Sequence, residues 1–520
     1  MTEPLNISEM LISQARVQPH RIGIRDLDRE LSFADWNTRA CRLANNLIAL
    51  GLKPGERIAV IAHNRIEWAE IYVAVAKAGL VAVPINFRLS GPEVLFICQD
   101  CSVSAIITED PFIDLVEAIR DPLAELTPTF ISMGALPYPH WTEYEHLVKS
   151  GPSNEPGLNV NAEQSWCLMY TSGTTGNPKG AIRNHHSAAL ISIMTCVELG
   201  FSRNDHGLLV MPMCHANSLY FFISLLSIGA TSTIFSVRSF DPAHCLGTIS
   251  RTGISFTSLT PTHYMMLLDI PEDIRQAADL SKVQRLMISS ATARVETKKA
   301  VMQMFPNSGL FELYGSTEAA WVTMLHPEEQ FDHLGTVGRE VIGSAAIKLL
   351  DDVGNEVPDG TPGELYSCSP YNFSGYWNLP EKTQEAFRGD YLSVGDIAVR
   401  DQAGFIRLID RKKNMIITGG ENVYPTEVEA MLGAHPDIKD VAVVGCAHPK
   451  WGEEVTAAVV LQDQAVINEA ELLAWTKGKI AGFKRPRRIV FLKSDEMPRN
   501  TTGKIMHRIL RERLSKPSHS

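Results

Sequence analysis

Two hydrophobic patterns alternate along the chain up to about residue 335. Short apolar runs predict buried strands, and they lie at residues 57–62, 81–85, 105–108, 166–170, 208–211, 254–257, 285–288 and 310–313. Between them, apolar residues recur at helical spacing, as in the helix that begins at Phe33 and carries Ala40, Leu43, Ala44 and Leu47. This order of strand, helix and strand predicts parallel sheets covered by helices.

The pattern changes beyond residue 335. Short alternating strands at 346–350, 363–366 and 405–409 predict a small, mostly antiparallel β region. A helix from Thr426, strands at 441–444, 456–460 and 489–492, and a helix at 470–477 predict a compact α+β unit. The expected fold class is α/β: a large N-terminal domain of parallel-rich sheets with helices and a small β region, followed by a small α+β C-terminal domain. Residues 134–163, rich in Pro, Gly and Asn, are expected to form a surface excursion.

The composition fits a globular protein of more than one domain, with 520 residues, 45% of them hydrophobic and 21% charged. The formal net charge of -11 argues against a protein that coats nucleic acid. Residues 207–237 carry no charged side chain, but Pro212, Asn217 and Gly229 favour strand, loop, helix and strand over a membrane span. The N-terminus lacks a signal-peptide pattern, and nine scattered cysteines suit a reducing cytoplasm.

Residues 170–180 read YTSGTTGNPKG and follow the strand predicted at 166–170. Glycines let the backbone approach a phosphate closely, hydroxyl and N–H groups can bind its oxygens, and Lys179 adds a positive charge. The spacing G-x-x-x-x-G-K-[ST] is not met, so this is not a Walker A loop. The alternative is a mobile linker, although linkers seldom follow a buried strand directly.

Four further motifs follow along the chain, and three of them have both a functional and an ordinary interpretation. Glu318 ends the motif YGSTE (314–318) and can hold Mg²⁺, although an exposed loop glutamate is the commoner case. Asp396 ends YLSVGD (391–396) and can accept both hydroxyls of a ribose, or it caps a turn. The motif IDRKKN (409–414) carries a basic cluster. Lys504 ends PRNTTGK (498–504), where the default is a solvated lysine near the chain end.

The order and spacing of these five motifs resemble the adenylate-forming acyl-CoA synthetase superfamily, together with luciferases and nonribosomal adenylation domains. The resemblance covers nearly the whole chain. It implies an N-terminal domain at 1–412 and a mobile C-terminal domain at 413–520, with the hinge near Lys413. Members join a carboxylic acid to AMP, release pyrophosphate and transfer the acyl group to a thiol. The implied cosubstrates are ATP and CoA, with Mg²⁺, and a homodimer is compatible with the resemblance; neither nucleic acid nor a transmembrane segment is expected.

The resemblance also assigns the nucleotide site. The residues that would cradle the ATP β- and γ-phosphates are Thr171, Ser172, Gly173, Thr174, Thr175 and Lys179. Those expected around the nucleotide base are Ala291, Tyr314, Gly315, Ser316 and Thr317. Glu318 and Thr174 would hold Mg²⁺, and Asp396 and Arg411 would hold the ribose. Lys504 would bridge the attacking carboxylate and the α-phosphate. Ser290 departs from the glycine that many members carry, which puts the shape of the adenine pocket in question.

For the thiol step, the segment Gly419, Gly420 and Glu421 resembles the one that moves in beside the CoA tunnel. His215 resembles the residue where the acyl pocket meets that tunnel, which makes it the fourth expected catalytic residue beside Lys504, Glu318 and Thr174. A structural histidine is the alternative, and Cys214 replaces the usual larger residue before it. Positions that contact CoA in some members are Arg88, Trp451, Lys484 and Arg485.

By the same resemblance, the acyl pocket includes Met194, Asn217, Ser258, Ser289 and Trp321. Small polar residues beside one large aromatic side chain favour a short, aryl or cyclic, or partly polar acid. An amino acid is disfavoured, because no Asp or Glu lies between Asp205 and Asp241 to pair with an ammonium. Three alternatives stay open: a medium- or long-chain fatty acyl-CoA synthetase, an enzyme that loads another thiol acceptor, and a non-catalytic nucleotide- or acyl-binding protein.

Overall fold

The computed structural model describes residues 5–126, 128–134, 137–171, 178–291, 293–418, 421–499 and 503–515. They divide into two compact units. The large unit comprises the chain up to Ala346 together with Ser367–Leu392, and the small unit comprises Ile347–Tyr366 and the chain from Ser393 onward.

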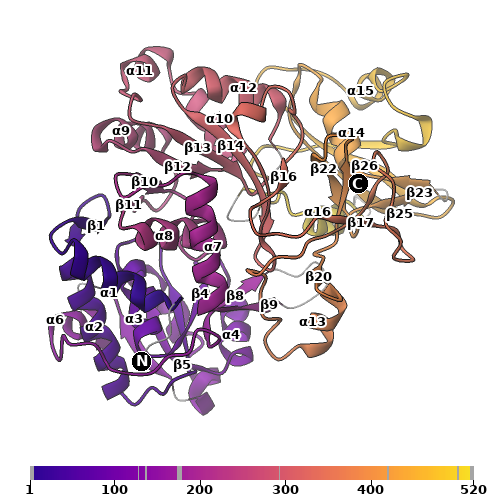
Figure 1. The fold of residues 1–520 in the computed structure, drawn as a ribbon. Coiled ribbons are helices and arrows are strands. Elements are labelled where there is room, and N and C mark those ends of the chain that lie inside the picture. The colour runs from indigo at the N-terminus through magenta and orange to yellow at the C-terminus, as the bar shows by residue number, and fades with distance from the viewer. Residues whose placement is uncertain are drawn as a thin grey trace. The chain divides into compact units, whose positions relative to one another are not determined.

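Two mixed sheets form the large unit (Figure 1). The first has the strand order β7-β6-β5-β3-β4-β8-β9. Its strands are β3 (Arg57–Ile61), β4 (Val81–Ile85), β5 (Val103–Thr108), β6 (Thr129–Ser132), β7 (Thr142–Glu143), β8 (Ser165–Thr171) and β9 (Lys179–Asn184). Neighbouring strands are parallel except at the edge, where β9 runs antiparallel to β8.

The second sheet has the order β16-β15-β14-β13-β12-β10-β11-β1-β2. Its strands are β1 (Ile22–Arg25), β2 (Glu30–Ser32), β10 (His206–Leu209), β11 (Thr231–Ile234), β12 (Phe256–Leu259), β13 (Arg285–Ser289), β14 (Gly309–Ser316), β15 (Ala320–Leu325) and β16 (Arg339–Glu340). The strands from β1 to β14 pair in parallel, and β2, β15 and β16 add antiparallel edges. The predicted parallel-rich α/β class is therefore confirmed.

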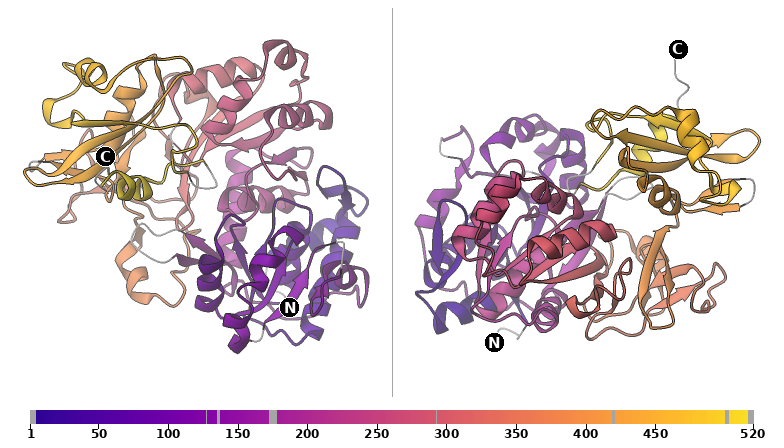
Figure 2. Two further views of the ribbon diagram at one scale, coloured as in Figure 1. Left: turned by 180° about the vertical axis from the view of Figure 1, so that it is seen from behind. Right: turned by 90° about the horizontal axis from the view of Figure 1, so that it is seen from above.

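Helices fill the space between the two sheets and cover their outer faces. The inner helices are α1 (Ile7–Val17), α2 (Phe33–Ala49), α3 (Glu67–Lys77), α7 (His185–Glu198) and α8 (Ala216–Ile228). Their apolar side chains share one core with residues from both sheets, such as Ile58 and Phe256. The helices α4 (Gly91–Asp100) and α5 (Ile113–Glu117) cover the seven-stranded sheet, and α9 (Pro242–Thr252), α10 (Pro261–Leu268) and α12 (Val295–Met304) cover the other (Figures 1 and 2).

Smaller elements complete the large unit. They are α6 (Tyr144–Lys149), α11 (Glu272–Ala277), α13 (Pro380–Ala386), the hairpin β19 (Phe387–Arg388) and β20 (Tyr391–Leu392), and 3₁₀ turns at Asp110–Phe112, Asp121–Leu126 and Pro327–Glu329. The uncharged stretch 207–237 forms β10, a loop, α8 and β11, as expected, and α8 ends at Gly229, whose φ of 72° suits a helix C-terminus. No helix of the described residues is long and apolar enough to cross a membrane.

The prediction of a surface excursion at 134–163 is wrong for the central residues 142–149. Strand β7 adds to the sheet edge there, and α6 follows it directly. Tyr144, Leu147 and Val148 of α6 are buried in the main core, and the Tyr144 hydroxyl donates a 2.7 Å hydrogen bond to Glu70. Apolar residues at helical spacing therefore decided the structure, although Pro and Gly flank them.

The small unit contains two sheets. The antiparallel sheet β17-β18-β21-β22 consists of β17 (Lys348–Leu350), β18 (Gly363–Tyr366), β21 (Asp396–Arg400) and β22 (Ile406–Arg411). The other follows the order β24-β23-β26-β25, with β27 beside β26, and consists of β23 (Ile416–Thr418), β24 (Glu421–Val423), β25 (Ile438–His448), β26 (Gly452–Leu461) and β27 (Arg488–Phe491). Its helices are α14 (Pro425–Gly433), α15 (Glu469–Trp475) and α16 (His507–Leu514), with a 3₁₀ turn at Gly482–Lys484.

Candidate active site

The glycine-rich loop joins β8 to the edge strand β9, which runs antiparallel to it. β8 ends at Thr171 and β9 begins at Lys179, and these two residues face each other across the ladder. The predicted phosphate-binding residues Ser172, Gly173, Thr174 and Thr175 lie outside the described residues.

The carboxylate of Glu318 lies beside the start of this loop. Glu318 is only 8% exposed and sits in the turn between β14 and β15. Its Oε1 atom accepts hydrogen bonds from the Tyr376 hydroxyl at 2.9 Å and from the Thr171 hydroxyl at 3.3 Å. Two motifs that are 147 residues apart in the chain therefore meet at one carboxylate.

Tyr376 also contacts Lys179. The Lys179 ammonium lies 4.0 Å from the centre of the Tyr376 ring, which places a cation over its electron-rich face. A β-bridge between Ala181 and Tyr376 fixes the backbone of this pair. Tyr376 was not among the residues predicted for the site, because no local sequence pattern connects residue 376 with the glycine-rich loop.

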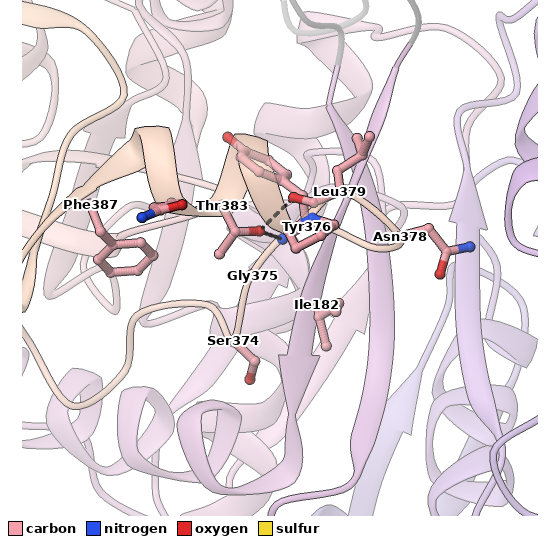
Figure 3. Close-up of a pocket in the computed structure, with 10 residues that line it drawn as sticks. Ile182, Ser374, Gly375, Tyr376, Asn378, Leu379, Thr383 and Phe387 are labelled. Carbon is pink, nitrogen blue, oxygen red and sulfur yellow. Dashed lines mark hydrogen bonds between the residues drawn. The ribbon is translucent and has the colours of Figure 1, made fainter.

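A cavity of about 470 Å³ opens beside Tyr376 (Figure 3). Ile182, Gly375 and Thr383 line it, and the Thr383 hydroxyl accepts a 2.8 Å hydrogen bond from the Tyr376 N–H. None of the site residues predicted from the sequence lines this cavity. The residues around this cavity therefore hold Tyr376 in place, and the cavity is not the predicted nucleotide site.

Arg183 is a second residue that the sequence analysis missed. It is 1% exposed in β9, and its guanidinium donates to the main-chain carbonyls of Tyr371 at 2.5 Å, Glu318 at 3.0 Å and Thr317. The guanidinium carbon also lies 5.5 Å from the centre of the Tyr220 ring. An arginine inside the short buried strand after the glycine-rich loop was the signal available in the sequence.

The strand that leads to Glu318 is held by close packing. A side chain at Gly315 would come within 2.1 Å of the Ala320 carbonyl oxygen, so this position requires glycine. Tyr314 is buried in the same strand, and the Ser316 hydroxyl accepts a 2.9 Å hydrogen bond from the N–H of Ala319. Thr317 contributes the carbonyl that Arg183 binds.

A buried ion pair also holds this strand, at a position before Gly315. The Lys298 ammonium of α12 lies 2.6 Å from the Glu312 carboxylate of β14, and their side chains are 0% and 6% exposed. Burial raises the pKa of Glu312, while Lys298 opposes that shift.

The predicted ribose residues pair across β21 and β22 of the small unit. Asp396 faces Arg411 in the ladder, and the Arg411 Nε donates a 3.0 Å hydrogen bond to Asp396 Oδ1. Asp410, next in the chain, is half-buried, and desolvation raises the pKa of its carboxyl. Lys413 is exposed just after β22.

Lys504 belongs to the same small unit. A β-bridge joins Arg499 to Ile505, the residue after Lys504, and Gly503 adopts a φ of 79°. The side chain keeps contact with solvent, yet desolvation, and after it the nearby Arg411, lowers the pKa of its ammonium. Asp396 and Asp410 oppose that shift, so Lys504 lies within electrostatic reach of the ribose pair.

His215 and Arg88 come together at the start of α8. Burial, with the positive charge of Arg88 as a second cause, lowers the pKa of His215 to about 4, so the imidazole is neutral at pH 7. The Arg88 guanidinium is exposed and lies 5.3 Å from the centre of the Phe87 ring. Burial raises the pKa of the neighbouring Cys214 thiol to about 12.

The remaining predicted CoA residues lie in the small unit. Arg487 and Lys450 place their charges 4.4 Å and 4.8 Å from the Trp451 ring centre. Lys484 forms a 2.7 Å ion pair with Glu427, and Glu421 is exposed in β24. Gly419 and Gly420 lie outside the described residues.

Arg485 uses its N–H donors for hydrogen bonds within the small unit. Its guanidinium binds the Thr476 hydroxyl and the Leu473 carbonyl, each at 2.9 Å. Both acceptors lie at the end of α15, so in this structure Arg485 fastens that helix.

The five predicted acyl-pocket residues are all buried in the large unit: Met194, Asn217, Ser258, Ser289 and Trp321. The Asn217 amide donates a 2.9 Å hydrogen bond to the Ser289 hydroxyl. The Trp321 N–H donates to the Thr195 hydroxyl at 2.8 Å, and its ring packs on Tyr220 and Phe221.

The turn after Ser289 keeps the backbone that glycine would favour. Ser290 adopts a φ of 69°, in the left-handed region, so the serine accepts a strained conformation and the turn itself is retained. Ala291 follows it and is half-buried. The departure at Ser290 therefore leaves the left-handed turn intact.

Comparison with known proteins gives the class. A family model described as AMP-binding enzyme matches residues 11–377, and one described as AMP-binding enzyme C-terminal domain matches residues 427–504. The chain belongs to this family of AMP-binding enzymes.

Individual relatives narrow the class further. A feruloyl-CoA synthase of Amycolatopsis is 31% identical over 510 residues, covering 97% of this chain and 98% of the relative. A long-chain-fatty-acid–CoA ligase of Mycobacterium tuberculosis is 30% identical over 519 residues, covering 98% and 99%. The structure of ATP-bound MatB from Rhodopseudomonas palustris superposes with a TM-score of 0.89 at 28% identity, covering 98% of this chain and 99% of that one. The predicted AMP-forming acid–CoA ligase, with ATP and CoA as cosubstrates, is confirmed at the level of the family.

Proposed function

We propose that this ligase activates a short, aryl or cyclic, or partly polar carboxylic acid and transfers it to CoA. The observation that carries the proposal is the character of the pocket residues. Asn217, Ser258 and Ser289 are buried polar residues on the side of the sheet that also holds the Trp321 ring. A long alkyl chain binds best in a continuous apolar tunnel, and these hydroxyl and amide groups interrupt one.

In the proposed nucleotide site, the glycine-rich loop from Thr171 to Lys179 holds the β- and γ-phosphates. Glu318 and the Thr171 hydroxyl offer hard oxygen ligands of the kind that Mg²⁺ takes together with phosphate oxygens. Among the described residues, no group of three or more His, Cys, Asp and Glu side chains is placed to hold a metal ion, so phosphate oxygens would complete the ligands of Mg²⁺ in this proposal. When bound, Mg²⁺ would neutralise phosphate charge.

In the first half-reaction, a carboxylate oxygen attacks the α-phosphorus of ATP and the bond to pyrophosphate breaks. The anionic acid must approach an anionic phosphate, so a positive charge has to lie between them. We assign this role to Lys504, and we assign the ribose hydroxyls to Asp396 and Arg411. The Asp396–Arg411 hydrogen bond supports the second assignment, since it orients the carboxylate.

In the second half-reaction, the CoA sulfur attacks the acyl carbonyl and AMP leaves. His215 lies at the start of α8, and its imidazole is neutral at pH 7. A neutral imidazole can orient the thiol and does not repel the nearby Arg88. Arg88, Trp451 and Lys484 would contact CoA, and residues 419–421 would line its path. Arg485 has a weaker claim, because its donors already bind α15. The boundary 1–412 and 413–520, with a hinge near Lys413, remains part of this proposal.

A pyrophosphate-release assay with a panel of acids, with and without CoA, tests the proposal. Aryl and short acids should outperform long-chain acids, and thioester should form with CoA. A preference for long chains would favour the fatty acyl alternative. Acid-dependent pyrophosphate without thioester would favour another thiol acceptor, and no acid-dependent pyrophosphate would favour a binding protein.

A homodimer and a cytoplasmic location complete the proposal. Ile193 and Val197 lie one turn apart on α7 and are 46% and 59% exposed, so they offer an apolar surface to a second copy. The molar mass in solution, from light scattering, decides between monomer and dimer. All nine cysteines are free thiols, which supports a reducing compartment.

A further inference from the structure

We propose that the acid carries a neutral hydrogen-bond donor, a hydroxyl or amino group, that binds the side-chain oxygen of Asn217. This inference rests on the proposed function, because it takes Asn217 and its neighbours as the acyl pocket. It adds a chemical requirement for the part of the acid that lies away from the reacting carboxylate.

Asn217 presents an acceptor without a donor. Its side chain is 8% exposed, and its NH₂ group is committed to the Ser289 hydroxyl at 2.9 Å. Its Oδ1 atom is buried and accepts no hydrogen bond within the described part of the chain. Buried polar atoms in folded proteins nearly always have a partner, so an acceptor held in this way indicates that a donor arrives from elsewhere.

Ser258 repeats the observation on the neighbouring strand. It is 4% exposed, and its Oγ atom likewise has no partner among the described residues. Ser258 pairs with Met287 in the parallel ladder of β12 and β13, and Ser289 lies two positions after Met287. Side chains two positions apart share one face of a strand, so both serines point to the side of the sheet that Asn217 occupies.

The two atoms together select the chemistry of the ligand. Asn217 Oδ1 can only accept, whereas the Ser258 hydroxyl can donate or accept. A ligand hydroxyl satisfies both, because it donates to Asn217 and accepts from Ser258. An amino group satisfies Asn217, and it can donate to Ser258 as well.

The surrounding residues select a neutral group on an apolar body. Met194, Leu313 and Trp321 belong to the same buried cluster, and the Trp321 N–H is already committed to Thr195. No Asp or Glu occurs between Asp205 and Asp241, so α8 brings no counter-charge for an ammonium. An alkyl chain bound there would leave Asn217 and Ser258 without partners.

The test uses matched acids that differ at one substituent. Cinnamate and benzoate series carrying hydroxyl, amino, methoxy or hydrogen at the same ring position, with octanoate as an alkyl reference, are compared by kcat/KM for CoA-dependent pyrophosphate release. We expect the hydroxyl or amino member of the best series to exceed its hydrogen and methoxy partners by about 10- to 100-fold, as for a buried acceptor that gains or lacks its donor.

Variants assign the preference to these residues. Asn217→Leu and Ser258→Ala should each lower the ratio of kcat/KM for the donor-bearing acid to kcat/KM for its donor-free partner. Ser224→Ala is the matched control, because Ser224 is also buried in α8 but its hydroxyl already donates to the Tyr220 carbonyl at 2.6 Å. Thermal unfolding of each variant verifies that it folds.

Two results would overturn the inference. Equal kcat/KM for donor and donor-free acids would mean that Asn217 and Ser258 find their partner in solvent, and a preference for methoxy acids or octanoate would mean that the pocket needs no donor. Absence of pyrophosphate release with every acid is a different result, since it would remove the proposed function as well.

Discussion

Arg183 donates a 3.0 Å hydrogen bond to the main-chain carbonyl of Glu318. The strand that leaves the glycine-rich loop and the turn that presents the candidate metal carboxylate are therefore joined by one buried guanidinium. This arrangement makes Arg183 a positioning residue, because it binds the backbone of Glu318 and not the nucleotide.

Replacement of Arg183 should weaken both folding and the use of Mg²⁺. Arg183→Met leaves three carbonyls without their donor, so we expect a loss of about 2–4 kcal/mol in the free energy of unfolding. The Mg²⁺ concentration for half-maximal pyrophosphate release should also rise. For Arg183→Lys, this concentration should lie between the values for the unchanged protein and for Arg183→Met. Tyr144→Phe removes a buried hydrogen bond to Glu70 and serves as the destabilised control. An equal Mg²⁺ requirement in Arg183→Met and Tyr144→Phe would reduce Arg183 to a structural role.

Tyr376→Phe should affect the same carboxylate more selectively. The change removes the 2.9 Å hydrogen bond to Glu318 and keeps the ring that Lys179 contacts. Loss of a hydrogen bond that orients a metal ligand typically weakens metal affinity by about 10-fold or more. Titration of activity with Mg²⁺ measures this, and Tyr371→Phe is the control, since its hydroxyl binds the Ile342 carbonyl. An unchanged dependence of activity on Mg²⁺ would show that the Tyr376 hydroxyl does not orient the Glu318 carboxylate for metal binding.

Lys504→Ala should separate the two half-reactions. Loss of the positive charge should slow adenylate formation by about 10²–10³, or about 2–4 kcal/mol of transition-state stabilisation. Thioester formation from a pre-made acyl-adenylate should be spared. Lys439→Ala, an exposed lysine of the same unit, controls for the change in net charge. Equal loss in both steps would refute the assignment.

The rate of adenylate formation should fall as the pH rises. Desolvation and Arg411 lower the pKa of Lys504, so its ammonium loses its proton at a lower pH than an ordinary lysine. The positive charge is present below that pKa and lost above it, so pyrophosphate release measured across the alkaline range should decline. Lys504→Arg keeps its charge throughout and should lack this decline. The same alkaline decline in both proteins would place the titrating group elsewhere.

The buried pair of Lys298 and Glu312 predicts a stability effect. Lys298→Met leaves the Glu312 carboxylate buried without its partner, which should cost about 3–5 kcal/mol in denaturant unfolding. The double change Lys298→Met with Glu312→Leu should recover most of that loss, because no charge remains buried. A double variant as unstable as the single one would show that packing, and not the unpaired charge, causes the effect.

The hydrophobic pattern predicted the central strands of both large sheets, because parallel strands buried on both faces appear as continuous apolar runs, and it missed the outer strands β1, β2, β6, β7, β9, β15 and β16. It was misleading at 134–163, where flanking Pro and Gly obscured Tyr144 and Leu147 of α6. The motifs identified Glu318 and Asp396 by local chemistry. Arg183 and Tyr376 act through contacts with residues far away in the chain. The sequence offers a local signal for Arg183, an arginine in a short buried strand, but it does not identify the partners of either residue.

Tyr376 has one further consequence for what the site can bind. Its ring face meets the Lys179 ammonium and its hydroxyl meets the Glu318 carboxylate. One phenol therefore contacts a positive and a negative side chain at the same time. Such a surface is suited to a ligand that is itself of mixed charge, with phosphate oxygens toward the lysine and a divalent cation toward the glutamate.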